Sequence, residues 1–121
     1  MKTKQYLSAL AVMSLMLSAS LAWGHASAKK TIPENDAVLS ESPTELAVDF
    51  GAPAKLLALT VSADEMDPIE IDVSSATAVD GWVNVDIEPL LPNSYKVSWR
   101  AMGLDGHITA GEFTFTVSSS N

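Results

Sequence analysis

The chain has 121 residues, no cysteine, and 15 acidic against 7 basic residues, which gives a formal net charge of −8. This charge excludes nonspecific binding to nucleic acid or to anionic lipid. It suits a soluble protein that attracts cations, and solubility alone explains it equally well. The lack of cysteine excludes disulfide bonds, thiolate metal ligands and cysteine nucleophiles, so the fold must be held by its core alone.

Residues 1–24 have the features of a secretory signal peptide. Lys2 and Lys4 precede an apolar segment at residues 7–21, and small residues follow. The segment is shorter than the roughly 20 apolar residues that a membrane-spanning helix needs, so we expect no membrane anchor after cleavage. Three cleavage points fit the small-x-small rule, and they would leave His25, Ser27 or Lys29 as the first residue.

The first of these cleavage points would make residues 25–121 one mature domain. Loss of Lys2 and Lys4 would leave 5 basic residues against all 15 acidic ones. Residues 29–42 are polar and rich in turn-forming residues, with Pro33 expected in a turn. Val38 and Leu39 are expected to anchor this segment against the core.

Short stretches of alternating apolar and polar residues then recur at roughly ten-residue spacing. They predict strands at residues 46–50, 55–62, 69–73, 82–87, 95–101 and 112–117. No segment after the signal peptide has a helical period. Six or seven such strands predict an all-β, antiparallel sandwich with Greek-key connections.

The loop between the last two strands contains Asp105 and His107, two residues apart. Residues at i and i+2 point to the same side of an extended backbone, so a carboxylate and an imidazole would project together. Both are metal-ligand types, but two ligands do not complete a metal site. The alternative interpretation is an ordinary Asp-Gly turn with a solvated histidine.

A cut before His25 would supply the missing ligands. The freed α-amine and Nδ1 of His25 can chelate one metal ion, and His107 and Asp105 would add a nitrogen and an oxygen. Three nitrogens and one oxygen suit tetragonal copper(II), which also has the highest affinity among divalent first-row metals. The amine must lose a proton with a free pKa of about 7.7 to 8, so binding should weaken as the pH falls.

The sequence resembles the CopC/PcoC family of periplasmic copper-binding proteins over nearly the whole mature chain. The most specific match is Tyr95-x-Val97-x-Trp99-Arg100-x4-Asp105-Gly106-His107, followed by Gly111-x-Phe113-x-Phe115-x-Val117. His25-Ala26 after the signal peptide, the turn near Pro33 and the strand at residues 46–50 add to it.

The resemblance implies that His25, Asp105 and His107 bind copper(II). It also implies a seven-stranded antiparallel Greek-key β-sandwich of the immunoglobulin-like or cupredoxin-like kind. The expected role is copper resistance or homeostasis in the periplasm, as a monomeric carrier or buffer without catalysis. A membrane copper transporter of the CopD type is the expected partner.

One departure from the family concerns methionine. Some members hold copper(I) in a methionine-rich loop that also contains a histidine, but the matching residues 64–68 have one methionine and no histidine. Only Met66 and Met102 remain after signal cleavage. Thioether ligands select copper(I), so we expect a member that binds copper(II) only, with Met66 serving in packing.

Other residues have simpler expected roles. Tyr95 and Trp99 are expected in the core, Arg100 on the opposite and solvated face, and Glu112 is a candidate for orienting a ligand imidazole. Two alternative functions remain. One is a copper oxidoreductase with a histidine brace, and the other is a structural β-sandwich without a metal.

Overall fold

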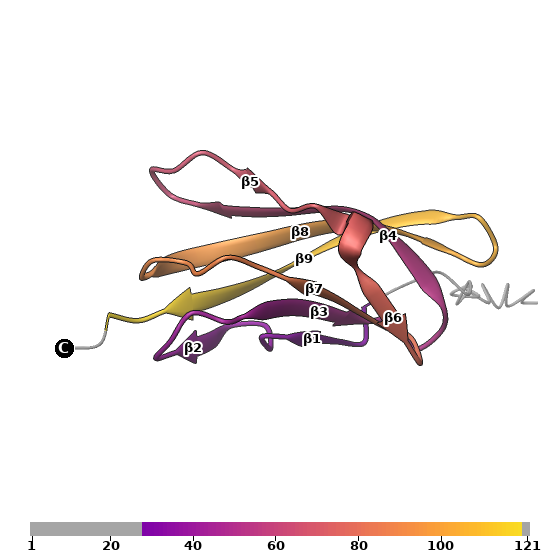
Figure 1. Cartoon of the computed structure of the whole chain (residues 1–121), viewed down its shortest axis with the longest axis horizontal. Helices are drawn as coiled ribbons and strands as arrows, with labels where there is room; N and C mark the ends of the chain where they lie inside the picture. The colour runs from indigo at the N-terminus through magenta and orange to yellow at the C-terminus, as the bar shows by residue number, and fades with distance from the viewer. Residues whose placement is uncertain (1–27, 120–121) are drawn as a thin grey trace, which may run out of the picture.

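Two β-sheets pack face to face in the computed structural model, which describes residues 28–119 (Figure 1). One sheet has the order β1-β3-β7-β6, with bounds Lys30–Ile32, Glu45–Asp49, Trp82–Asp86 and Thr77–Val79. The other has the order β2-β9-β8-β4-β5, with bounds Ala37–Leu39, Ile108–Val117, Asn93–Gly103, Ala54–Ala63 and Ile69–Glu70. A short 3-10 turn, η1 (Val73–Ser75), connects β5 to β6.

The core is built from the apolar residues that alternate along the longer strands. In β8, Tyr95, Val97, Trp99 and Ala101 are buried, whereas Lys96 and Arg100 face solvent. Within the described residues no charged side chain is buried, so the sandwich is held by apolar packing and by the backbone hydrogen bonds of the two sheets. The predictions that Tyr95 and Trp99 belong to the core are confirmed.

The predicted all-β sandwich is confirmed, but the expected number of seven strands is wrong. The described residues form nine strands, and β2 pairs with β9 in parallel whereas all other pairs are antiparallel. The three strands that were not predicted, β1, β2 and β6, have three residues each. Three residues are too few for an alternating pattern to be recognised.

Two local predictions need correction. Leu39 packs against the core as expected, but Val38 is 71% exposed, because successive residues of β2 point to opposite faces. The strand expected at residues 69–73 ends at Glu70. Asp72 then caps η1, where its side chain accepts a hydrogen bond from the backbone N–H of Ser74.

Gly111 is required by the indole of Trp99, which lies directly opposite on β8. A Cβ added at Gly111 would lie 2.3 Å from Cζ2 of Trp99. The indole cannot easily move away, because it is 4% exposed and its ring packs edge-on against Phe50 with centroids 5.1 Å apart. The absence of a side chain at Gly111 therefore leaves space for the indole of Trp99 near the β8–β9 hairpin.

We expect Gly111→Ala to lower the free energy of unfolding by about 1–3 kcal/mol, as overpacking of a core does. Urea denaturation monitored by circular dichroism measures the free energy of unfolding. Ala110→Ser is the matched control, because Ala110 is exposed on the outer face of the same strand, and it should change stability by less than about 0.5 kcal/mol. Equal stability of the two variants would mean that the indole does not occupy this position.

Candidate metal centre

The β8–β9 hairpin ends in a tight loop that is closed by backbone hydrogen bonds and contains one left-handed glycine (Figure 1). Gly106 N–H donates to the carbonyl of Gly103 at 3.0 Å, and Gly103 N–H donates to the carbonyl of His107 at 3.1 Å. Gly106 has φ +81°, a left-handed conformation that glycine adopts without strain. A turn followed by a left-handed residue is a common three-residue hairpin connection, and it fixes where Asp105 and His107 lie.

The structure brings Asp105 and His107 into direct contact. The backbone N–H of His107 donates to Oδ1 of Asp105 at 3.0 Å, and Nδ1 of His107 lies 2.9 Å from Oδ2 of Asp105. The two side chains therefore project together as predicted. The cause differs, because the contact comes from a side chain closing a turn onto the backbone two residues later and not from an extended strand.

This contact determines which imidazole atom suits a metal. Because Nδ1 of His107 faces the carboxylate of Asp105, Nε2 is the nitrogen directed away from that contact. A carboxylate on one ring nitrogen fixes the tautomer and the ring orientation of a metal-binding histidine. The side chains are 63% and 38% exposed for His107 and Asp105, so a metal ion can reach the pair from solvent.

The described chain begins at the same end of the sandwich as this loop. Lys29 N–H donates to the carbonyl of Asp49 at 2.7 Å, which places the start of β1 beside the end of β3. The chain then turns into β4, whose first residue, Ala54, pairs with Gly103. The predicted ligand His25 lies outside the described residues, and its place at the site stays a prediction.

Two further candidates lie on the outer face of the second sheet. Glu112 is five residues from His107 along β9, and its carboxylate is 3.9 Å from Nζ of Lys96 on β8. Both side chains are more than half exposed. Arg100 is also exposed, as predicted. Glu112 is thus paired across the strands in the structure, and its expected role in orienting an imidazole gains no support from this contact.

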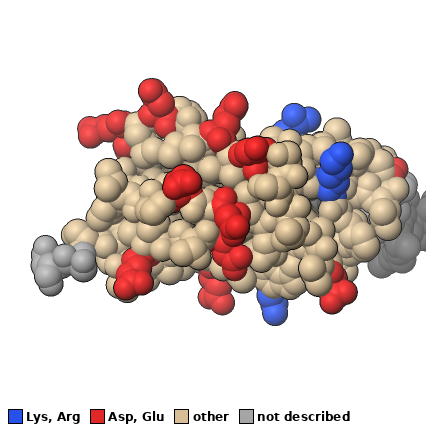
Figure 2. Space-filling model, viewed as in Figure 1, with Lys and Arg blue, Asp and Glu red and all other residues tan. Residues whose placement is uncertain are grey.

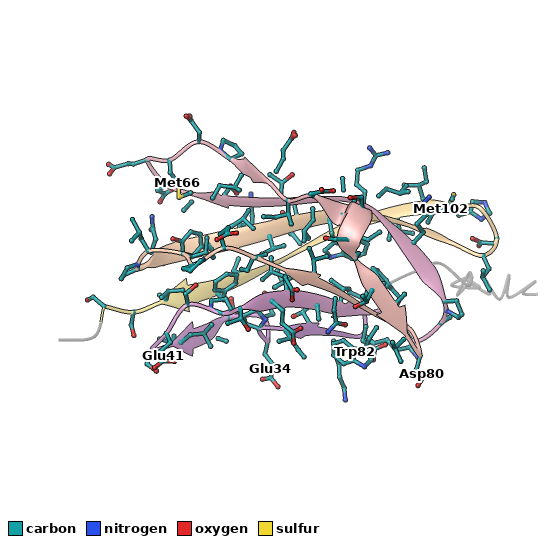
Figure 3. All side chains as sticks on the ribbon, viewed as in Figure 1. Glu34, Glu41, Met66, Asp80, Trp82 and Met102 are labelled. Atoms are coloured by element: carbon teal, nitrogen blue, oxygen red, sulfur yellow. The ribbon has the colours of Figure 1, made fainter. Side chains whose placement is uncertain are left out.

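The two methionines of the described residues, Met66 and Met102, lie at opposite ends of the sandwich (Figure 3). Met66 is in the loop between β4 and β5 and packs against the core, which confirms the packing role predicted for it. Met102 is at the end of β8 beside the hairpin loop. The loop that contains Met66 follows Ala63, the last residue of β4, which pairs with Tyr95 at the far end of β8. At the usual rise per residue, Tyr95 and Met102 are roughly 24 Å apart along β8.

Within residues 28–119, no three His, Cys, Asp or Glu side chains converge so that they could hold a metal ion. Asp105 and His107 are thus a pair of candidate ligands and not a complete metal site within the part of the chain that the structure describes. The Asp-Gly turn that the sequence indicated at this loop is present, with Gly106 in the left-handed conformation. No helix among these residues is long and apolar enough to cross a membrane.

Comparison with known proteins identifies the family. The CopC domain family model matches residues 28–118. Copper resistance protein C of Escherichia coli is 27% identical over 106 residues, which cover 79% of this chain and 83% of that protein. Protein YobA of Escherichia coli strain K12 is 25% identical over 124 residues, which cover 90% of this chain and 91% of that protein.

Solved structures share the fold of this chain. CopC from Methylosinus trichosporium OB3b has a TM-score of 0.63 at 21% identity, over 76% of this chain and 92% of that chain. PcoC, a methionine-rich copper resistance protein from Escherichia coli, has a TM-score of 0.59 at 25% identity, over 78% of this chain and 99% of that chain. The family model spans most of the sequence and nearly all of the described sandwich, and the chain belongs to the CopC family.

Proposed function

We propose that this chain is an exported, periplasmic copper(II)-binding protein that carries or buffers copper in copper resistance or homeostasis. The observation that carries the proposal is the contact between Asp105 and His107 in a hydrogen-bonded hairpin loop, at the end of the sandwich where the described chain begins. The family and the names of its relatives support copper as the cargo. Catalysis is not part of the proposal, and a CopD-type membrane transporter is the proposed partner.

The proposed site joins this loop to the start of the mature chain. His25 precedes Ala28 by three residues, and three residues span at most about 10 Å. We propose that, within this reach, the α-amine and Nδ1 of His25 bind the same metal ion as the hairpin loop. The sandwich would then serve to hold the two ends of a single coordination site together.

The ligand atoms favour copper(II). His25 would supply two nitrogens, His107 would supply Nε2, and Asp105 would either give an oxygen or hold the His107 imidazole through Nδ1. Nitrogen and oxygen ligands in a tetragonal arrangement suit copper(II), which binds such sites more tightly than other divalent first-row metals. The acidic surface of the chain would favour the approach of the cation.

Copper(I) is a less suitable cargo for this chain. Thioether ligands select copper(I), and the two methionines of the described residues lie far apart and cannot share an ion (Figure 3). The similar protein PcoC, by contrast, is methionine-rich. The separation of the two methionines supports a member of the family whose binding site is specific for copper(II).

Titration of residues 25–121 with copper(II) tests the proposal. We expect one copper ion per chain, with an electron paramagnetic resonance spectrum typical of tetragonal nitrogen and oxygen ligation, and weaker binding of zinc. Competition against a chelator of known affinity gives the dissociation constant. A protein that stays folded and binds no copper(II) under these conditions would refute the proposed function.

A further inference from the structure

An apolar groove of about 360 Å³ lies on the open flank of the sandwich, between the edge strand β5 and the segment that follows β7. Its apolar lining comes from Ile69, Ile71, Ile87 and Leu90. Three of these are half-buried and pack against the core, whereas Ile69 is 37% exposed. We call this surface the flank groove. An edge strand beside exposed apolar side chains is a surface that proteins use for binding extended segments.

The charged residues that line the flank groove all have the same sign. Glu70 and Asp72 lie on one side, and Asp86 and Glu88 lie on the other, whereas no lysine or arginine among residues 28–119 lines it. Figure 2 shows acidic side chains across this face of the molecule. Asp72 is held in place by Ser74, whose side chain and backbone N–H donate to Oδ1 at 2.6 and 2.9 Å and lower the pKa of the carboxyl group.

We propose that the flank groove docks a basic segment of a partner protein, one in which lysine or arginine side chains alternate with aliphatic ones. The aliphatic side chains would cover Ile69, Ile87 and Leu90, and the cationic side chains would meet the carboxylates on both sides. In an extended segment, alternate residues face opposite sides, which allows one strand to make both kinds of contact.

The charge of the molecule decides among possible occupants. A second copy of this chain would bring 15 acidic residues against 5 basic ones in the described part, and the two copies would repel each other. An anionic membrane surface is repelled for the same reason. A basic segment of another protein is the occupant that gains from these charges.

The groove is well separated from the candidate metal centre. Ile71 N–H donates to the carbonyl of Leu59 on β4, and Leu59 is five residues from Ala54, the residue that pairs with Gly103 at the hairpin end. Five residues of strand correspond to about 17 Å. A partner held in the flank groove would therefore leave the Asp105–His107 loop open for metal exchange. The docking surface and the metal site can be tested independently.

A fluorescein-labelled, N-acetylated octapeptide that alternates lysine and valine is the probe for this groove. We expect saturable binding to the folded protein by fluorescence anisotropy at low salt. The variant Glu70→Gln/Asp86→Asn/Glu88→Gln should weaken binding about tenfold or more. The control Glu34→Gln/Glu41→Gln/Asp80→Asn removes the same charge from residues on other surfaces (Figure 3) and should change binding less than about threefold. Asparagine tolerates the φ of +50° at position 80.

A second peptide that alternates lysine and serine tests the apolar contribution and should bind much more weakly. The variant Ile69→Ser should reduce binding of the valine peptide and leave the serine peptide unaffected. Equal losses in the groove and control variants, or equal binding of the two peptides, would show nonspecific attraction and overturn the proposal. Saturable shifts of the groove amides with calcium alone would mark a cation site and would also overturn it.

Discussion

Replacing His107 with alanine is expected to lower the copper(II) affinity of the mature chain by more than about 100-fold. Loss of a residue that merely orients a ligand costs 10- to 100-fold in metal affinity, and loss of a ligand should cost more. The side chain of His107 is 63% exposed and lies outside the core, so the variant should fold with a stability within about 0.5 kcal/mol of the parent. Chelator competition measures the affinity, and urea denaturation measures the stability.

Leu104→Ala is the matched control for this experiment. Leu104 lies in the same loop and is 85% exposed, but it has no ligand atom, so its replacement should leave copper affinity unchanged. Asp105→Asn provides a second comparison. It removes the carboxylate from Nδ1 of His107 and should weaken binding by about 10- to 100-fold if Asp105 mainly orients the imidazole. A His107→Ala protein that binds copper(II) within threefold of the parent would place the metal elsewhere.

The long strands could be predicted from the sequence because one face of each strand packs against the core and the other faces solvent. β8 buries Tyr95, Val97, Trp99 and Ala101, and β9 buries Phe113, Phe115 and Val117, so each strand repeats the alternation often enough for it to be recognised. The same strands carry the hairpin loop, and for this reason the sequence also predicted where Asp105 and His107 would lie. Their contact depends only on residues 103–108 and is therefore a local property of the chain.

The short edge strands could not be predicted in the same way. β2 exists because its backbone pairs in parallel with β9, with Ala37 opposite Phe115, although the two residues are far apart in the sequence. β6 pairs with β7 through three residues, all of which are exposed. Such short strands form because a neighbouring strand offers backbone groups for hydrogen bonding, and their own side chains contribute little to the choice.

Strand pairing between distant segments also limits how much of the candidate site could be predicted from the sequence. The sequence placed two ligand types in one loop, but it could not show that residues 28–30, where the described part begins, lie at the same end of the sandwich. That placement depends on the pairing of β1 with β3 and of β4 with β8. Gly111 is a similar case. A side chain at this position would clash with the indole of Trp99 on the neighbouring strand, and the sequence around Gly111 does not show this.

Adding one serine before His25 is expected to lower copper(II) affinity by more than about 100-fold, although every side chain of the mature protein is retained. The added residue converts the α-amine of His25 into a peptide nitrogen and so removes one of the proposed ligands together with its chelate ring. Loss of a residue that orients a ligand lowers metal affinity 10- to 100-fold, and loss of a ligand itself should lower it more. Chelator competition on the two chains, both prepared with defined N-termini, measures the difference.

A serine added after Asn121 is the control, because it changes the chain length by the same amount without touching the proposed site. A chain that begins at Lys29 should bind as weakly as the His107→Ala protein, since it lacks both nitrogens of His25. Its fold should persist, because the described pairing of β1 with β3 begins at Lys30. Equal affinity of the serine-extended and parent chains would exclude the α-amine as a ligand. It would leave Asp105 and His107 as a weaker site that does not depend on where the signal peptide is cleaved.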